Sequence, residues 1–285
     1  MAATGIVVEP APAKLNLDLY VEGRRDDGYH LLDSVVGFTE FGDVLTVAPA
    51  AAFRLDLDGP FAGALAAAGE SLVTRAVHDL AAVLDRRPEV ALALTKRIPL
   101  AAGLGGGSAD AAAALRALAR LWGLETDTSP LVEVARGLGA DVPACLAGRP
   151  ARLTGIGDAL APAPAIPRLE LVLANPDVPA PTGAVYRALD PTAFALAPAR
   201  QETGADWPAW LTAGRNDLEP AAVAVAPAIA EVRRALAATD ARLVRLSGSG
   251  ATVFAAYADA ATADAAAAGL ARAYPHWWRQ RTHLR

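Results

Sequence analysis

Four glycines crowd a short segment that lies between an expected strand and an expected helix. Gly103, Gly105, Gly106 and Gly107 form the loop GLGGGS together with Ser108, which we expect to cap the helix. Glycine tolerates positive φ angles and carries no side chain, so successive backbone N–H groups can turn toward one point. A helix that begins there adds unpaired N–H groups and the positive end of its dipole. The loop therefore predicts a binding site for a phosphate group.

The loop differs from two familiar phosphate-binding loops. It is not a Walker A loop, because no Lys-Ser or Lys-Thr pair follows its last glycine. It does not fit the dinucleotide fingerprint either, since the third glycine position counted from Gly103 holds Ser108. A flexible turn without function is the alternative. We favour the phosphate site, because glycine loses the most entropy on folding and several glycines are therefore a costly way to build a mere turn.

A polar face on an expected strand near the N-terminus offers further candidates. Lys14 lies at the entry of the strand, and Asn16 and Asp18 alternate with leucines along it. An edge lysine in solvent is the alternative interpretation of Lys14. The polar face that Asn16 and Asp18 share favours instead a site that the three side chains line together.

Asp141 precedes Val142 and Pro143 at an expected turn. A helix cap is one interpretation, because Asp favours the N-cap position and Pro the first helical turn. The other is a general base that takes a proton from a hydroxyl group, provided that a nearby cation keeps the carboxylate ionised. The residue types alone leave both interpretations open.

Two further turns carry residues of interest. Tyr29 and His30 end a polar turn and could hold an aromatic or hydrogen-bonding ligand, although such a pair is more often structural. The sequence Ser247-Gly248-Ser249-Gly250 is a second glycine turn, between two expected strands, and as a plain hairpin turn it would need no function.

Hydrophobic periodicity predicts a mixture of strands and helices. We expect strands at 6–8, 15–21, 35–41, 44–47, 53–57, 90–94, 169–173, 243–246 and 252–256. We expect helices after the glycine loop and at 71–84, 129–138, 218–238 and 261–273, with Ser71 and Ser129 as N-caps. Strands outnumber helices early in the chain, which favours an α+β fold over a regular βαβ array. An Ala/Pro-rich linker at 159–167 predicts two domains, at residues 1–160 and 161–285.

Composition narrows the class of protein. The chain has 285 residues, 53% of them hydrophobic and 20% charged, with a net charge of −5. No broad basic surface for nucleic acid or for an acidic membrane is expected. The single cysteine, Cys145, excludes a disulfide framework and a cysteine metal site. Without a signal peptide or a long apolar run, the sequence predicts a soluble cytoplasmic protein.

Taken together, three motifs resemble those of the GHMP small-molecule kinases in order and spacing. They are Lys14-Leu15-Asn16, the stretch from Pro99 through Gly-Leu-Gly-Gly-Gly-Ser, and Ser247-Gly248-Ser249-Gly250. The turn from Gly23 to His30 is similar to that of the GHMP kinases whose acceptor is a cytidine-diphospho-methylerythritol. The resemblance covers nearly the whole chain. It implies a two-domain fold, with a ribosomal-S5-like N-terminal domain and a ferredoxin-like C-terminal domain.

The resemblance also implies an activity. Phosphoryl transfer from ATP, with Mg²⁺, would go to the C2 hydroxyl of the cytidine diphosphate methylerythritol, a step of the non-mevalonate route to isoprenoids. A small-molecule substrate is the implied partner, and a monomer or a homodimer is expected. The alternatives are another GHMP kinase, acting on homoserine or a sugar, and a nucleotide-binding regulator without catalysis.

Site residues follow from the same resemblance. Asp141 would be the catalytic base and Lys14 its cationic partner near the reacting hydroxyl. The residues implied for substrate are Asn16, Tyr29, His30 and Tyr186, and those implied for ATP are Ser71, Lys96, Pro99, Gly103, Leu104, Gly105, Gly106, Gly107, Ser108 and Ala109. No Mg²⁺ ligand is fixed, and Ser108 is a candidate by position only. Ser71 stands where the family has Asn, Asp158 where it has Glu, and Ala101-Ala102 where it often has glycines.

Overall fold

The computed structural model describes residues 5–69, 71–125, 128–200 and 207–285. The chain forms two compact units that interleave along the sequence. The first unit comprises Met1–Ala13, Gly42–Leu100 and Gly105–Arg149, and the second comprises Lys14–Phe41, Ala101–Leu104 and Pro150–Arg285. Each unit is therefore built from segments that lie far apart in the sequence.

The strands of the first unit are organised around β5 (Val90–Thr95). It pairs antiparallel with the end of β3 (His30–Pro49) and parallel with β4 (Arg54–Asp58), and β1 (Val7–Asn16) also pairs with β3. The prediction of separate strands at 35–41 and 44–47 is wrong, because β3 runs through both. Gly42 does not break the strand. A Cβ atom there would lie 2.3 Å from the carbonyl oxygen of Ala11, so glycine permits a close approach of two backbones.

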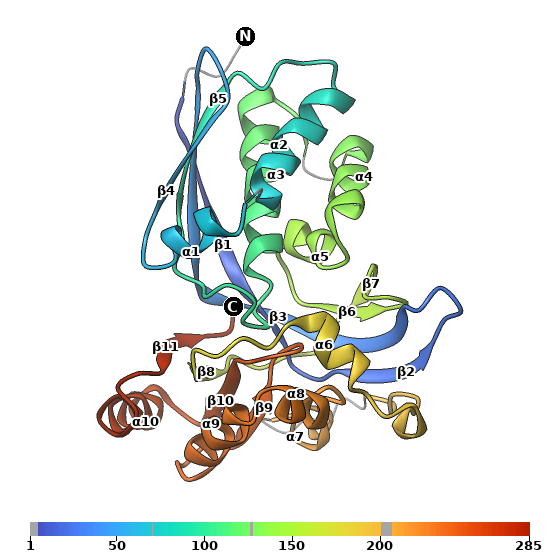
Figure 1. The fold of residues 1–285 in the computed structure, drawn as a ribbon, viewed down its shortest axis with the longest axis vertical. Coiled ribbons are helices and arrows are strands. Elements are labelled where there is room, and N and C mark those ends of the chain that lie inside the picture. Colours follow the sequence, from blue (N-terminus) through green and yellow to red (C-terminus); the bar gives the residue numbers. More distant parts are fainter. Residues whose placement is uncertain (1–4, 70, 126–127, 201–206) are drawn as a thin grey trace. The chain divides into compact units, whose positions relative to one another are not determined.

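Helices lie beside these strands in the first unit (Figure 1). They are α1 (Ala62–Ala67), α2 (Leu72–Val83), α3 (Gly106–Trp122), α4 (Ser129–Leu138) and α5 (Val142–Ala147). The middle of α3 is rich in alanine and almost wholly buried. Small side chains let neighbouring helices approach closely, and α2, α4 and α5 all pack against α3.

The predicted helix starts are partly correct. Ser71 caps α2, because its hydroxyl accepts a hydrogen bond from the backbone N–H of Thr74 at 3.2 Å. Ser129 does not cap α4, since it is already helical and Thr128 occupies the N-cap position. The short helix α1 was not expected, because it buries none of its residues and so shows no apolar stripe in the sequence.

The second unit contains a four-stranded antiparallel sheet in the order β11-β8-β10-β9. Its strands are β8 (Glu170–Asn175), β9 (Leu243–Leu246), β10 (Val253–Tyr257) and β11 (Trp278–His283). The sequence WRQRTH of β11 lacks a run of apolar residues, which is why this strand was not expected. The sheet packs against helices through a core that includes Val172, Val253 and Ile229.

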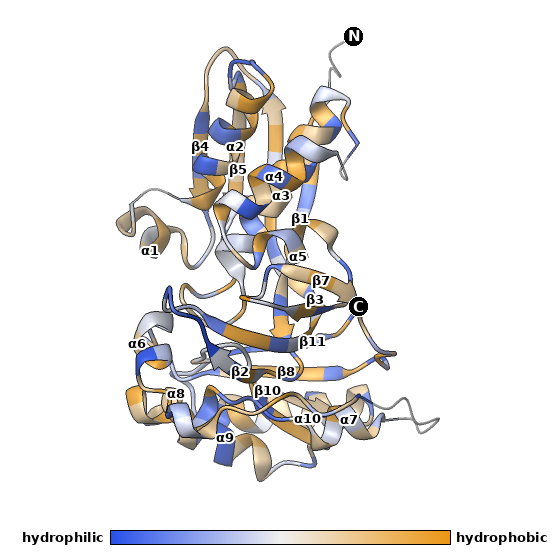
Figure 2. Ribbon diagram, turned by 90° about the vertical axis from the view of Figure 1, so that its right-hand side faces the viewer, coloured by the Kyte–Doolittle hydropathy of each residue, from blue (hydrophilic) through white to orange (hydrophobic). Residues whose placement is uncertain are grey.

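The helices of the second unit are α6 (Thr182–Arg187), α7 (Ala209–Ala213), α8 (Glu219–Val225), α9 (Ala228–Ala237) and α10 (Ala260–Ala273), with a 3₁₀ turn η1 (Pro191–Ala193). The single helix predicted at 218–238 is divided into α8 and α9, because Pro227 disfavours helical backbone at Ala226. In Figure 2 the ribbon of α9 carries both hydrophilic and hydrophobic colours, as expected for a helix with one buried face.

Shorter strands complete the second unit. β2 (Tyr20–Arg24) forms a hairpin with the start of β3, and β6 (Ala151–Thr154) pairs with both β3 and β7 (Ala159–Pro162). The expected linker at 159–167 thus begins as an exposed edge strand, where prolines are tolerated. The strand predicted at 15–21 is interrupted, since β1 ends at Asn16 and β2 begins at Tyr20.

Candidate active site

Parts of all three sequence motifs meet in the second unit. The hydroxyl of Ser247 donates a hydrogen bond to the carbonyl oxygen of Gly103 at 2.8 Å. The same hydroxyl accepts one from the backbone N–H of Asn16 at 3.3 Å. The backbone N–H of Lys14 donates to the carbonyl oxygen of Leu104 at 2.9 Å. Residues far apart in the sequence are thereby fixed to one another.

The glycines at this junction are required by close packing. A Cβ atom on Gly103 would lie 2.2 Å from the carbonyl oxygen of Ser247 and 2.8 Å from the backbone nitrogen of Gly250. Gly103, Gly248 and Gly250 all have positive φ angles, which side chains disfavour. The turn at 247–250 is therefore more than a plain hairpin turn, because its backbone packs directly on the start of the glycine loop.

The second half of the glycine loop opens α3 in the first unit. Gly105 is the N-cap residue, with a φ of 63°, and Gly106 is the first helical residue. The expectation that Ser108 caps this helix is wrong, since Ser108 already lies in its first turn. The first backbone N–H groups of a helix have no partner within it, so those of Gly106, Gly107 and Ser108 are available to a phosphate.

Other residues of this stretch contribute through the backbone or through packing. The side chains of Pro99, Leu104 and Ala109 are buried. The backbone N–H of Ala109 already donates to the carbonyl oxygen of Gly105 at 2.8 Å. Among the implied phosphate-binding residues, Ala109 therefore offers no free donor at its own backbone.

Lys96 lies in a buried cluster with two aspartates in the first unit. Its Nζ donates to Oδ2 of Asp110 at 2.7 Å and also to Oδ2 of Asp43, and all three side chains are almost fully buried. Burial alone would lower the pKa of Lys96, but the two carboxylates outweigh it and raise that pKa. The Nζ atom lies 3.0 Å from the position that a Cβ on Gly106 would occupy, so the cluster supports the first turn of α3. Because the ammonium group of Lys96 is bound to Asp43 and Asp110, only its aliphatic side-chain carbons or its backbone could contact an adenosine.

Asp110 makes the stability of the fold depend on pH. Burial opposes the charged carboxylate more than Lys96 favours it, and raises the pKa of Asp110 from 3.8 to about 8. Between these two values the folded state keeps a proton that the unfolded state releases, so stability falls as pH rises. We expect Asp110→Asn to remove this dependence and to gain stability relative to wild type from pH 5 to pH 8.

Urea unfolding of both proteins at several pH values measures this difference. Asp79→Asn, which changes an exposed carboxylate of α2, is the control and should run parallel to wild type. Parallel pH curves for wild type and Asp110→Asn would show that Asp110 keeps an ordinary pKa.

An aromatic cluster in the second unit contains two of the predicted substrate residues. The rings of His30 and Tyr186 are 5.0 Å apart and inclined at 35°. Phe194 meets the His30 ring edge-on at 5.8 Å, with an angle of 89°. Burial, helped by the charge of Arg24, lowers the pKa of His30, so the ring is neutral at pH 7 and presents one donor and one acceptor. Tyr29, which precedes His30 in the sequence, has an exposed fraction of 60%.

Asn16 presents an unused acceptor. Its Nδ2 donates to the hydroxyl of Ser34 at 2.8 Å, whereas its buried Oδ1 has no hydrogen-bond partner in the part of the chain that the structure describes. An unpaired buried acceptor costs about 1–3 kcal/mol, which a ligand with a donor group could offset. Asp18 does not share this site, because its carboxylate binds Arg200 and the backbone N–H of Val35.

The two predicted catalytic residues, Lys14 and Asp141, belong to different units. Lys14, in the second unit, is 4% exposed, which rules out a solvated edge lysine. Asp141, in the first unit, occupies the N-cap position of α5, but its side chain makes no capping hydrogen bond. Helix capping therefore does not account for the carboxylate of Asp141.

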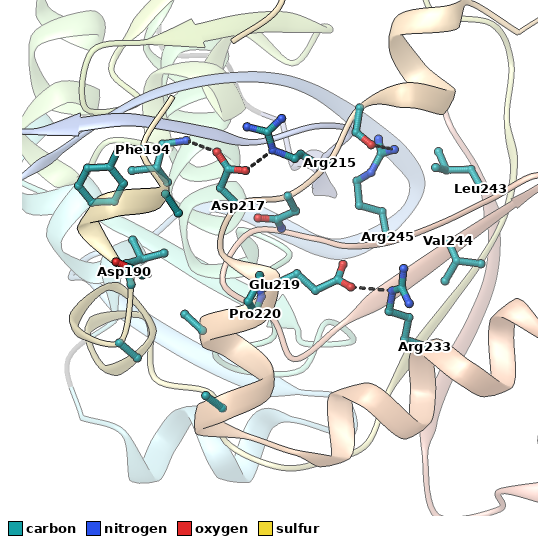
Figure 3. Close-up of a pocket in the computed structure, with 18 of the residues that line it drawn as sticks. Asp190, Phe194, Arg215, Asp217, Glu219, Pro220, Arg233, Leu243, Val244 and Arg245 are labelled. Atoms are coloured by element: carbon teal, nitrogen blue, oxygen red, sulfur yellow. Dashed lines mark hydrogen bonds and ion pairs between the residues drawn. The ribbon is translucent and has the colours of Figure 1, made fainter. Parts of the chain in front are cut away.

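A pocket of about 890 Å³ lies elsewhere in the second unit (Figure 3). None of the predicted site residues lines it. Its charges are largely paired, since Asp217 binds Arg215 and Glu219 binds Arg233, each at 2.6 Å. Phe194 lies at its edge and connects it to the aromatic cluster.

Within the described ranges, no cluster of three or more His, Cys, Asp or Glu residues could hold a metal ion. In the same ranges, every helix is too short or too polar to cross a membrane. Sequence reasoning did not find Phe194 or Arg200, because each is a lone residue in an Ala/Pro-rich stretch without a periodic pattern.

Comparisons with known proteins cover nearly the whole chain. The family model described as GHMP kinases N terminal domain matches residues 71–149, and the one described as GHMP kinases C terminal matches residues 194–276. A protein of Paramagnetospirillum magneticum named 4-diphosphocytidyl-2-C-methyl-D-erythritol kinase is 49% identical over 276 residues, covering 94% of this chain and 95% of its own. One of Paracoccus denitrificans with the same name is also 49% identical, covering 95% of this chain and 94% of its own.

Solved structures agree with these relatives. A crystal structure of 4-(cytidine 5'-diphospho)-2C-methyl-D-erythritol kinase is similar with a TM-score of 0.79 at 36% identity, covering 98% of this chain and 100% of its own. A homoserine kinase from Cytophaga hutchinsonii is similar with a TM-score of 0.70 at 16% identity, covering 100% of this chain and 96% of its own. The second likeness shows a shared fold alone. The two-domain fold of mixed α and β content that the sequence predicts is confirmed.

Proposed function

Because this chain belongs to the GHMP kinases, in the group named 4-diphosphocytidyl-2-C-methyl-D-erythritol kinases, we propose that it transfers the terminal phosphoryl group of ATP to the C2 hydroxyl of 4-diphosphocytidyl-2-C-methyl-D-erythritol. The product would enter the non-mevalonate route to isoprenoid precursors. The observation that carries the proposal is the hydrogen-bonded junction of Lys14, Asn16, Gly103 and Ser247. It joins the motif expected to bind the acceptor alcohol to the loop expected to bind phosphate.

Phosphoryl transfer depends mainly on positioning and on stabilisation of charge. We assign the ATP phosphates to the backbone N–H groups at the start of α3, where the helix dipole also favours negative charge. Lys14 would stabilise the negative charge that spreads over the transferred phosphoryl group. Asp141 would accept the proton of the attacking hydroxyl, because a carboxylate is a common general base in proton transfer. Ser71 and Lys96 stay predictions for the adenosine end.

Mg²⁺ fits this arrangement as an ion carried mainly by the phosphates of ATP. Such ions usually keep several waters and take only one or two protein ligands, so the lack of an acidic cluster among the described residues is no obstacle. The hydroxyl of Ser108 forms no hydrogen bond within the described chain and is the candidate ligand. When bound, the ion would neutralise phosphate charge.

The remaining predicted residues would bind the acceptor substrate. A cytosine ring suits the aromatic pair of His30 and Tyr186, and the neutral imidazole can hydrogen-bond to the edge of the base. Exposed Tyr29 would cover the base from outside. The unpaired Oδ1 of Asn16 would accept a hydrogen bond from a hydroxyl of the methylerythritol.

A panel of acceptors tests the proposed function. ADP formation is measured with ATP, Mg²⁺ and, in turn, 4-diphosphocytidyl-2-C-methyl-D-erythritol, homoserine, mevalonate and galactose. We expect turnover with the cytidine diphosphate alcohol and none above background with the others. Turnover of homoserine or a sugar, with the cytidine compound inert, would contradict the assignment. No turnover with any acceptor, despite ATP binding, would favour a nucleotide-binding regulator.

A further inference from the structure

A segment without regular structure crosses the second unit beside β2. We call residues 194–200 the strap. The backbone N–H of Ala195 donates to the carbonyl oxygen of Val21 at 3.3 Å, and that of Ala197 donates to Oε1 of Glu22 at 3.0 Å. Arg200 is the last residue of the strap. It binds the carboxylates of Asp18, which precedes β2 in the sequence, and of Asp33, which lies in β3. Hydrogen bonds and ion pairs thus hold the strap along its length against residues 18–33.

Arg200 is the strongest of these attachments. Its Nε and Nη2 hold the two carboxylate oxygens of Asp18 at 2.7 and 3.0 Å, and its Nη1 binds Oδ1 of Asp33 at 2.8 Å. The side chain of Arg200 is only 7% exposed, and those of Asp18 and Asp33 are buried. A planar guanidinium gripping carboxylates through paired hydrogen bonds is a strong and directional contact.

The carboxylate of Asp33 stays charged despite its burial. Burial alone would raise the pKa of Asp33, but Arg152 and Arg200 outweigh it and lower that pKa. The ion pair between Asp33 and Arg200 therefore persists at neutral pH. The rest of the strap has no comparable anchor, because it consists of alanines, a proline, Phe194 and Leu196, which is 78% exposed.

Phe194, at the other end of the strap, lies between two features of the second unit. On one side its ring meets the His30 ring edge-on at 5.8 Å. On the other side it borders the open pocket of about 890 Å³, at whose edge it is labelled in Figure 3. Because one side of the ring faces this pocket, its place against His30 depends on how the strap is held.

We propose that Arg200 is a positioning residue for the cytidine end of the substrate site. By gripping Asp18 and Asp33 it holds the strap in place, so that Phe194 keeps the His30 ring beside Tyr186. Arg200 touches neither substrate nor ATP, and acts through Phe194. The proposal rests on the proposed function, because it assigns the His30 cluster to the base of the acceptor substrate.

Steady-state kinetics test the proposal with Arg200→Lys, Phe194→Ala and the double variant. Lysine keeps the charge but lacks the planar fork that binds both oxygens of Asp18 while it also binds Asp33. We expect each single variant to raise KM for the cytidine diphosphate substrate about tenfold, a change typical of one lost contact. KM for ATP and kcat should stay within about twofold of wild type. The double variant should be no worse than Phe194→Ala, because both changes act through the same ring.

Two further variants sharpen the kinetic test. Asp18→Asn weakens the ion pair with Arg200 from the carboxylate side. It must likewise raise KM for the cytidine diphosphate substrate and leave KM for ATP unchanged. This variant keeps the proposal testable if Arg200→Lys fails to fold. Arg168→Lys, an exposed arginine paired with Glu170 in the same unit, is the control and should match wild type. An additive double variant, or equal losses in both KM values and kcat, would overturn the proposal.

Hydrogen exchange tests the strap without any substrate. We expect the backbone N–H groups of Ala195 and Ala197 to exchange faster in Arg200→Lys than in wild type, with the exchange of β8 and β10 unchanged. Unchanged exchange in the strap would overturn the proposal. So would faster exchange combined with an unchanged KM for the cytidine compound. A wild-type enzyme inactive on that compound would instead contradict the proposed function, while the exchange data would still decide whether Arg200 holds the strap.

Discussion

Asp141→Asn is expected to lower kcat for the cytidine diphosphate alcohol by roughly 10²–10⁴-fold, the usual contribution of a positioned base. Asparagine keeps the size of the side chain but cannot accept the proton of the attacking hydroxyl. Because asparagine has nearly the same shape and volume as aspartate, the change should leave the fold intact. KM for ATP should stay close to that of wild type, since binding and proton transfer are separate contributions.

Single-turnover measurement of phosphoryl transfer gives this effect without interference from product release. Glu133→Gln is the matched control, because it removes an exposed carboxylate from α4 in the same unit. We expect the control to be as active as wild type and equally stable. If Asp141→Asn kept the wild-type rate, Asp141 would not be the base.

Gly103→Ala is expected to have the second-largest effect, on stability as well as on activity. The φ angle of Gly103 is 74°, and a Cβ atom would lie 2.2 Å from the carbonyl oxygen of Ser247. Left-handed backbone and forced overpacking together cost about 3 kcal/mol. The hydrogen bond from Ser247 to Gly103 should also be disturbed, which would weaken the binding of ATP.

Urea unfolding and KM for ATP measure the two consequences of Gly103→Ala. The control is Gly137→Ala, because Gly137 lies in α4 and a Cβ there meets no atom within 4 Å. Alanine is the better helix former, so the control should be more stable than wild type by up to about 1 kcal/mol, with unchanged activity. Wild-type stability and KM in Gly103→Ala would show that the junction at Ser247 is not tightly packed in solution.

Elements with a long periodic pattern were predictable from the sequence. The helix after the glycine loop and the helix at 261–273 are confirmed as α3 and α10 within a few residues. The limits of prediction lie where tertiary contacts override local signals. Gly42 reads as a break but lies inside β3, because it accommodates the backbone of Ala11. The polar strand β11 exists because β8 pairs with it.

In the candidate site too, local motifs were predictable from the sequence, whereas tertiary contacts were not. Motifs with fixed spacing located the glycine loop and the turn at 247–250, and the structure joins Gly103 to Ser247. Polar residues were harder to assign, because their role depends on partners distant in sequence. Asp18 shares a predicted face with Asn16 yet pairs with Arg200, 182 residues away. The roles of Lys14 and Asp141 and the domain boundary at residue 160 stay predictions.

The central claim, transfer of a phosphoryl group to the C2 hydroxyl, is tested most directly by ³¹P NMR of the product. The purified protein is incubated with ATP, Mg²⁺ and 4-diphosphocytidyl-2-C-methyl-D-erythritol. Because C2 carries a methyl group and no hydrogen, a phosphate on C2 gives a phosphomonoester signal without three-bond proton splitting. We predict that unsplit signal, formed in step with ADP. A phosphomonoester signal split by protons of C1 or C3, or no new signal at all, would contradict the account.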